Sequence, residues 1–120
     1  MIYVARNVKD CVSSYHPFLE ALTDFHGTKE EFVDAFLKDH IHYQPYWEHI
    51  IEFWEMRNES NIFFTSYERM KKDLKSVLKE LCVFLEKEIP SDDVLDRAVV
   101  HLSFDSMKSE LAFFPPFDVI

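Results

Sequence analysis

A short strand that runs straight into a helix is encoded near the start of the chain by the sequence IYVARNVKDCVSSYH, residues 2–16. Its first part, Ile2–Ala5, is β-prone and ends at a charged residue, Arg6, as buried parallel strands usually do. A second run of this kind, IFFTS, occupies residues 62–66 and ends at Tyr67. Because a long and mostly helical stretch separates the two runs, we expect an α/β fold that is mostly helical and has two short parallel strands.

Helical patterns fill the stretch between the two strand-like runs. Apolar residues follow a helical period from Val8 to about Phe25, although Pro17 must kink or divide this helix because it lacks a backbone N–H. Thr28 and Glu31 have the spacing of a capping box, which predicts that a new helix begins there.

Three further helices are predicted beyond residue 45. In the first of them, apolar residues recur with the spacing of one helix face, and we interpret Tyr46, Trp47 and Trp54 as core residues. The other two cover residues 74–85 and 94–102, where leucine and valine residues recur with the same period.

Composition and charge exclude several classes of protein. The chain has 120 residues, enough for one domain, and Gly27 is its only glycine. A Walker A loop and a Gly-x-Gly-x-x-Gly dinucleotide motif both need more than one glycine, so neither is present. The net charge of −9 is unfavourable for general nucleic-acid binding and for contact with an anionic membrane, and we expect neither partner. A small, locally basic pocket for an anion remains compatible with this charge.

The start of the chain and the two cysteines favour a cytoplasmic protein. The first residues lack the regions of a signal peptide, and no apolar run is long enough to span a bilayer. Cys11 and Cys82 have neither CxxC spacing nor a secretory context, so we interpret them as reduced, buried thiols. His40, His42 and His49 lie close together in the sequence, but the cysteines are remote; we expect surface or capping histidines and no metal site.

Four segments, taken in order, resemble the C-terminal half of the catalytic domain of the cytosolic sulfotransferases. They are YVARNVKD with SSY (residues 3–10 and 13–15), YWEH with a later tryptophan (46–49 and 54), TSYERMKKDL (65–74) and LSFDSMK (102–108). The resemblance makes residues 1–108 one partial domain and leaves residues 109–120 as a divergent apolar tail. It implies a partial sulfotransferase fold of the P-loop type, mostly helical with two short parallel strands.

The resemblance also implies which residues bind the sulfate donor, 3′-phosphoadenosine 5′-phosphosulfate (PAPS), and its product, adenosine 3′,5′-bisphosphate (PAP). In the family, the counterparts of Arg6 and Ser14 hold the 3′-phosphate, and the counterpart of Tyr67 reaches the adenine side. A guanidinium group such as that of Arg6 can hold two phosphate oxygens at once. Ligands of α/β proteins bind beyond the carboxyl ends of the strands, where Arg6 and Tyr67 stand. Taken alone, an arginine after a strand is more often a surface ion-pairing residue, and a serine within a helix is usually just exposed.

A later segment is implied to contact the adenine as well. It holds Ser103, Phe104 and Met107, and the last two of these would supply apolar surface for the purine. Without the family context, Phe104, Met107 and Tyr67 would be interpreted as core residues.

Two parts of the family's catalytic machinery have no counterpart in the chain. They are the lysine of a Pro-Lys-Ser-Gly-Thr-type loop and a histidine upstream of the first strand, and both would lie ahead of Met1. We therefore expect no catalytic residue here and interpret the chain as a truncated, inactive fragment of a sulfotransferase. The family's reaction is the transfer of a sulfuryl group from PAPS to a hydroxyl or amine of a small-molecule acceptor.

Two other functions are kept as hypotheses. The first is a non-catalytic nucleotide-binding or regulatory module that pairs with a full-length relative. The second is a helical interaction domain without nucleotide binding, which the four ordered motifs make the weakest of the three.

Overall fold

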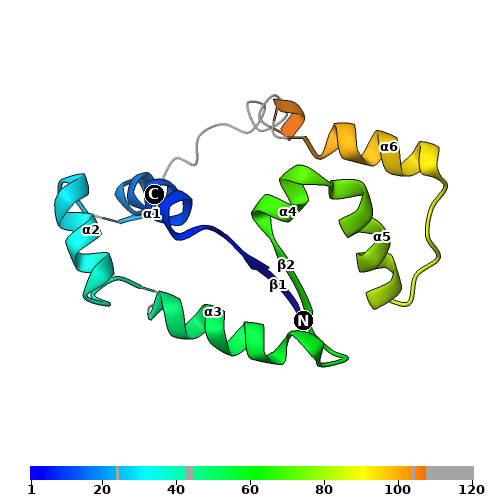
Figure 1. The fold of residues 1–120 in the computed structure, drawn as a ribbon. Helices are drawn as coiled ribbons and strands as arrows, with labels where there is room; N and C mark the ends of the chain where they lie inside the picture. The colour runs from blue at the N-terminus through cyan, green and yellow to red at the C-terminus, as the bar shows by residue number, and fades with distance from the viewer. Residues whose placement is uncertain (24, 43–44, 104, 108–120) are drawn as a thin grey trace. The chain divides into compact units, whose positions relative to one another are not determined.

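The computed structural model describes residues 1–23, 25–42, 45–103 and 105–107. The elements are, in chain order, β1 (Ile2–Ala5), α1 (Val8–Leu22), α2 (Lys29–Leu37), α3 (Tyr46–Glu55), the 3₁₀ turn η1 (Met56–Asn58), β2 (Phe63–Ser66), α4 (Tyr67–Lys72), α5 (Leu74–Phe84) and α6 (Asp92–His101) (Figure 1). The chain divides into two compact units, Met1–Lys71 and Lys72–Ile120, and each is described by itself.

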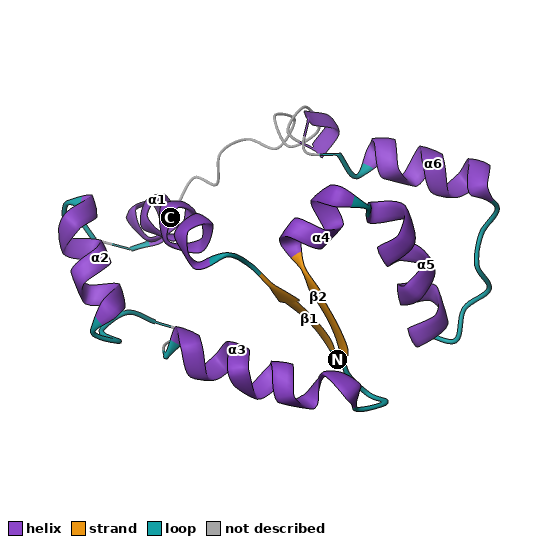
Figure 2. Ribbon diagram, viewed as in Figure 1, coloured by secondary structure: helices purple, strands orange, loops and turns teal. Residues whose placement is uncertain are grey.

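The two strands of the first unit form a parallel pair, as predicted from the sequence. Ile2 is the register partner of Phe63, and Ala5 is the partner of Ser66. Figure 2 shows β1 and β2 side by side as the orange elements of a mostly helical chain. On one face of this pair, the Tyr3 ring stacks on Phe64 in β2, with 5.3 Å between the ring centroids.

Helix α1 runs without interruption through Pro17, from Val8 to Leu22. Of the two effects expected of this proline, a kink or a division of the helix, the division does not occur. A proline removes a single backbone hydrogen bond, and the helix continues because Leu19, two residues further on, is buried against α2. The helix ends earlier than expected, with Thr23 as its C-cap.

The core of the first unit lies where α1 packs against α2. It consists of Leu19 from α1 and of Phe32 and Phe36 from α2, of which Phe32 is completely buried. The capping box predicted at Thr28 and Glu31 is confirmed, because each side chain accepts a hydrogen bond from the backbone N–H of the other. This cap fixes the start of α2 and so the place of its two core phenylalanines.

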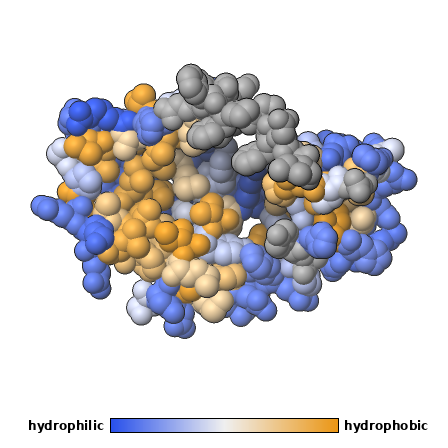
Figure 3. All heavy atoms as spheres, turned by 180° about the vertical axis from the view of Figure 1, so that it is seen from behind, coloured by the Kyte–Doolittle hydropathy of each residue, from blue (hydrophilic) through white to orange (hydrophobic). Residues whose placement is uncertain are grey.

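Helix α3 forms as predicted, but its tryptophans are not core residues. Trp47 and Trp54 are 54% and 51% exposed, and Tyr46 is half-buried against the ring of Phe36. A periodic apolar stripe identifies the face that a helix can bury, but not the element that would cover that face. Hydrophobic residues also reach the surface over a large part of the side shown in Figure 3.

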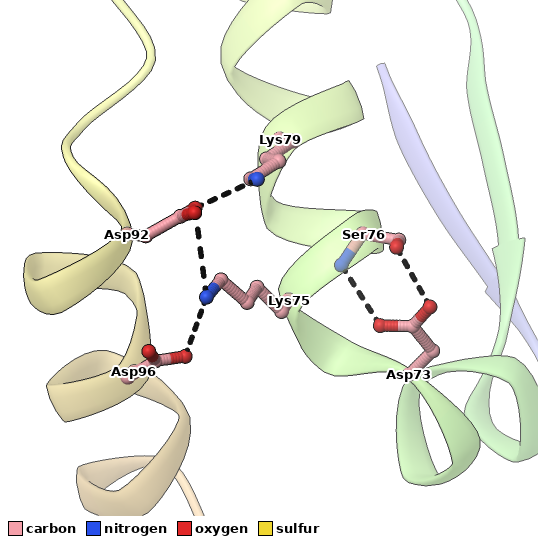
Figure 4. A network of polar contacts seen from close by, with 6 residues as sticks. All are labelled: Asp73, Lys75, Ser76, Lys79, Asp92 and Asp96. Atoms are coloured by element: carbon pink, nitrogen blue, oxygen red, sulfur yellow. Dashed lines mark hydrogen bonds and ion pairs between the residues drawn. The ribbon is translucent and has the colours of Figure 1, made fainter.

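The second unit pairs α5 with α6. Val77 from α5 and Leu95 from α6 are its buried apolar side chains among the described residues. Ion pairs join the two helices: Lys75 Nζ lies 2.7 Å from Asp96 Oδ1, and Lys79 Nζ lies 2.8 Å from Asp92 Oδ1 (Figure 4). Lys75 also reaches Asp92 at 3.5 Å, so one lysine bridges two successive turns of α6.

Candidate functional site

Arg6 and Tyr67 stand next to each other at the carboxyl ends of the two parallel strands. Ala5 and Ser66, the last residues of β1 and β2, are register partners, so the residues that follow them are brought together. The Cζ atom of Arg6 lies 4.7 Å from the centroid of the Tyr67 ring. This cation–π contact holds the guanidinium group at the edge where α/β proteins bind their ligands.

The Arg6 side chain has an unsatisfied donor. Its Nε atom is buried and has no hydrogen-bond partner among the described residues. Buried donors are normally paired, because leaving one unpaired costs free energy. An oxygen of a phosphate group is the kind of acceptor that would satisfy it.

The peptide bond between Arg6 and Asn7 is held from both sides. The hydroxyl group of Tyr46, on α3, donates to the Arg6 carbonyl oxygen at 2.5 Å. The Asn7 N–H donates to Oε1 of Glu68, on α4, at 2.7 Å. Asn7 also caps α1, because its side chain accepts a hydrogen bond from the N–H of Lys9 at 2.9 Å.

The ionisation of Tyr46 and Glu68 follows from their surroundings. Burial raises the pKa of Tyr46 to about 12, with smaller contributions from neighbouring ionisable groups. The hydrogen bond from the Asn7 N–H is the main cause that lowers the pKa of the Glu68 carboxyl group. Tyr46 is therefore a neutral donor and Glu68 a charged acceptor at neutral pH.

The contacts of Tyr46 and Glu68 with this peptide could not be predicted from the sequence. Their partners are 40 and 61 residues away along the chain, so no local pattern contains both ends of either bond. The sequence indicated their importance only in that both residues lie inside segments that resemble the cytosolic sulfotransferases.

Ser14 lies on α1, the helix that begins directly after the Arg6–Asn7 peptide, and its side chain is exposed. The first unit thus brings Arg6 and Tyr67 into contact and places Ser14 on the adjoining helix. That Ser14 contributes a donor to the same ligand stays a prediction.

The other predicted site residues belong to the second unit. Ser103 and Met107 lie after α6, and Phe104 lies outside the described residues. The Ser103 Oγ accepts a hydrogen bond from the Ser106 N–H at 3.3 Å, and the Met107 side chain is 42% exposed. A role of these residues toward adenine therefore stays a prediction too.

A pocket of about 270 Å³ opens beside Arg6 in the first unit. Its lining comes from β1, α1, α2 and α3 and includes Tyr3 and His49, whose Oη and Nδ1 atoms are 2.9 Å apart. His49 is thus engaged with a strand residue. Cys11, also in the lining, is a free cysteine, as is Cys82, and both are half-buried rather than buried as predicted.

The described part of the chain has neither a candidate metal-binding cluster nor a helix suited to span a membrane. No cluster of three or more histidine, cysteine, aspartate or glutamate side chains there could hold a metal ion. No helix within the same residues has both the length and the apolar character to cross a membrane.

Comparison with known proteins identifies the family. Residues 1–113 match the profile described as "Sulfotransferase domain". Sulfotransferase 1 family member D1 of Mus musculus is 39% identical over 111 residues, which cover 90% of this chain and 37% of the relative. Luciferin sulfotransferase of Photinus pyralis is 35% identical over 112 residues, which cover 93% of this chain and 30% of the relative. The chain belongs to the sulfotransferase family, and it spans only about a third of the length of these relatives.

Solved structures agree with the sequence relatives. Retinol dehydratase, in complex with androsterone and PAP, superposes with a TM-score of 0.85 at 29% identity; the match covers 93% of this chain and 33% of that one. A mouse sulfotransferase complexed with PAP superposes with a TM-score of 0.83 at 31% identity, covering 90% of this chain and 39% of that one. The mostly helical fold with a short parallel strand pair is therefore part of the sulfotransferase fold, as the resemblance implied.

Proposed function

We propose that this chain carries the 3′-phosphate side of a sulfate-donor site, in which Arg6, Ser14 and Tyr67 contact PAPS or its product PAP. The observation that carries the proposal is the contact between the Arg6 guanidinium and the Tyr67 ring at the carboxyl ends of the parallel strands. Two solved relatives that were crystallised with PAP support it.

The chemistry of the nucleotide fits these side chains. A phosphate group offers several oxygen acceptors, and the guanidinium of Arg6 offers donors in a planar fork, one of which is buried and unpaired. The Tyr67 ring keeps the guanidinium plane in place, and the Ser14 hydroxyl can add one further donor. Because the chain has a net charge of −9, the attraction for the anion is local to this arginine.

We assign the adenine side to the segment after α6. Phe104 and Met107 supply apolar surface for the purine, and the Ser103 hydroxyl supplies a polar group. The Met107 side chain is exposed and therefore accessible to a ligand.

The reaction that we assign to the complete catalytic domain is transfer of a sulfuryl group to a hydroxyl or amine of a small molecule, with PAPS as the source of the group. Within this chain, the named residues bind the nucleotide and do not touch the reacting atoms. The 120 residues contain no Lys-Ser-Gly-Thr-type loop, so we propose that the chain alone binds the nucleotide without turnover. An assay with labelled PAPS and a panel of phenols and alcohols tests this. Turnover above background that disappears in Arg6→Ala would contradict it.

Binding of PAP and of adenosine 5′-monophosphate (AMP) to the full chain tests the site itself. We expect weak binding of PAP and still weaker binding of AMP, because only PAP carries the 3′-phosphate. Arg6→Ala should lower the ratio of the two affinities by about tenfold or more, since it removes charge-assisted hydrogen bonds. Calorimetry or ligand-detected NMR measures this ratio.

Arg57→Ala is the matched control for that experiment. The Arg57 guanidinium also lies over an aromatic ring, 4.1 Å from the centroid of Trp54, but it belongs to η1. The PAP-to-AMP ratio should not change in this variant. Equal binding of the two nucleotides by the wild-type chain, or a preference that survives Arg6→Ala, would refute the proposed site.

A second candidate function is a nucleotide-binding or regulatory module that associates with a full-length relative. It is favoured by the exposed apolar side chains of the first unit: Ile2 and Val4 on β1, and Trp47, Ile51 and Trp54 on α3. Sedimentation of the chain with and without a full-length sulfotransferase tests it. Independent sedimentation of the two proteins at micromolar concentration would rule this function out.

A further inference from the structure

We infer that Tyr46 and Glu68 are positioning residues for Arg6: together they fix the Arg6–Asn7 peptide and so direct the guanidinium group toward the phosphate. This inference rests on the proposed function of Arg6 and adds the residues through which that function is prepared. Neither residue need touch the nucleotide.

The Arg6–Asn7 peptide needs partners that the sheet does not provide. The register of the strand pair ends at Ala5 and Ser66, so this peptide lies beyond the last paired residues. The carbonyl and N–H groups of a trans peptide point in opposite directions, and each needs a hydrogen-bond partner when water is excluded. The two partners must therefore come from opposite sides of the chain.

Two different helices supply these partners. Tyr46, the first residue of α3, donates its hydroxyl hydrogen to the Arg6 carbonyl at 2.5 Å. Glu68, in the first turn of α4, accepts the Asn7 N–H at 2.7 Å. One peptide plane is thereby held between α3 and α4, and we call these two hydrogen bonds the peptide clamp.

The peptide clamp fixes both the position of the Arg6 side chain and the direction of helix α1. Rotation of this peptide plane would change the backbone torsions of Arg6 and Asn7 on either side of it. Without the clamp, the Arg6 Cα, which lies beyond the last paired residue of β1, would be free to shift, and its guanidinium would leave the Tyr67 ring, whose centroid lies 4.7 Å from Arg6 Cζ. A changed Asn7 torsion would redirect α1, which begins at Val8 and carries Ser14, because Asn7 is the N-cap residue that turns the strand into the helix.

The chemistry of the two side chains suits a permanent clamp. Tyr46, whose pKa is about 12, stays protonated and keeps its donor at any physiological pH. Glu68 is ionised, and a carboxylate accepts a backbone N–H more strongly than a neutral group does. Because Glu68 directly follows Tyr67, one turn of α4 supplies both the aromatic surface under Arg6 and one half of the clamp.

The ratio of PAP to AMP affinity, measured on the full chain, tests the clamp. Tyr46→Phe and Glu68→Leu should each lower this ratio by about threefold to tenfold, the usual contribution of one hydrogen bond. Glu68→Gln keeps an acceptor oxygen without the charge, so it should lower the ratio less than Glu68→Leu does. Hydrogen exchange at the Asn7 amide, followed by NMR, should become faster in the order wild type, Glu68→Gln, Glu68→Leu.

Two matched controls separate positioning from general stability. The Tyr15 hydroxyl also donates to a backbone carbonyl, that of His42, at 2.9 Å, and the Glu31 carboxylate also accepts a backbone N–H, that of Thr28, at 2.7 Å. Tyr15→Phe and Glu31→Gln therefore delete or neutralise the same kinds of bond elsewhere in the first unit. We expect both to leave the PAP-to-AMP ratio unchanged.

Three results would overturn the inference. A ratio that survives both Tyr46→Phe and Glu68→Leu would overturn the clamp alone and leave the proposed function standing. An equal fall in the controls would show that the ratio follows overall stability rather than the position of Arg6. A wild-type chain without any preference for PAP would overturn the proposed function, and the inference with it.

Discussion

Replacing Phe32 by leucine measures how far the first unit depends on its aromatic core. Phe32 is 0% exposed, and its ring meets those of Tyr15, His16 and Phe25 edge to face at centroid distances of 5.8, 5.2 and 5.9 Å. Leucine cannot make these contacts, but it refills much of the volume. Removal of a whole buried ring costs about 3–5 kcal/mol. For Phe32→Leu we expect a loss of about 1.5 kcal/mol, which corresponds to a fall of roughly 6–12 °C in Tm.

Tryptophan fluorescence during urea unfolding is the appropriate assay, because it reports on the first unit. The chain has two tryptophans, Trp47 and Trp54, and both lie on α3. Leu37→Ala is the control: it lies on the same helix as Phe32 but is 68% exposed, so it should cost less than about 0.5 kcal/mol. A loss below about 0.5 kcal/mol for Phe32→Leu, or equal losses for both variants, would refute the assignment of Phe32 to the core.

Three further predictions concern single side chains. The hydrogen bond from the Asn7 N–H lowers the pKa of Glu68 in the folded chain, so Glu68 should stabilise the fold above the usual glutamate pKa of about 4.3 and lose this contribution as the pH falls through the lower folded value. The Tm should therefore fall less steeply toward acid pH in Glu68→Gln than in the wild type, and identical pH profiles of the Tm would contradict this. Lys75→Met should destabilise the second unit at low salt and less so at high salt, because Lys75 forms an ion pair with Asp96. Thermal unfolding followed by circular dichroism measures this, and a loss of stability that does not depend on salt would indicate lost packing instead. Burial raises the pKa of the Cys11 thiol, so iodoacetamide should label Cys11 slowly at pH 8 in the folded chain and quickly in urea. Equal labelling rates of Cys11 in the folded and the unfolded chain would contradict its partial burial.

The fold was predictable where the information is local or follows from strand geometry. The two β-prone runs end at Arg6 and Tyr67, and parallel pairing alone brings these two residues to the same edge. The start of α2 was predictable because Thr28 and Glu31 are three residues apart and satisfy each other. These predictions succeed because each depends on a short stretch of chain or on the period of a strand.

The remaining features depend on contacts that the sequence does not encode locally. Periodicity marked Trp47 and Trp54 as apolar positions on one helix face, but it does not tell which helix faces are covered. The bonds of Tyr46 and Glu68 with the Arg6–Asn7 peptide join three segments of the chain, and no spacing rule connects them.

The peptide clamp also has a consequence for the order in which the chain folds. Its two hydrogen bonds close segments of 40 and 61 residues, and the N-terminal amino group of Met1 bonds to Asn61 across a similar span of 60. Closing loops of this length is slow, because the chain loses entropy before the contact forms, whereas helices such as α1 and α2 can form from neighbouring residues. Helices are therefore expected early in refolding, and the strand edge with its oriented arginine late. Nucleotide affinity should be the last property that a refolding chain recovers, well after its helical circular dichroism signal.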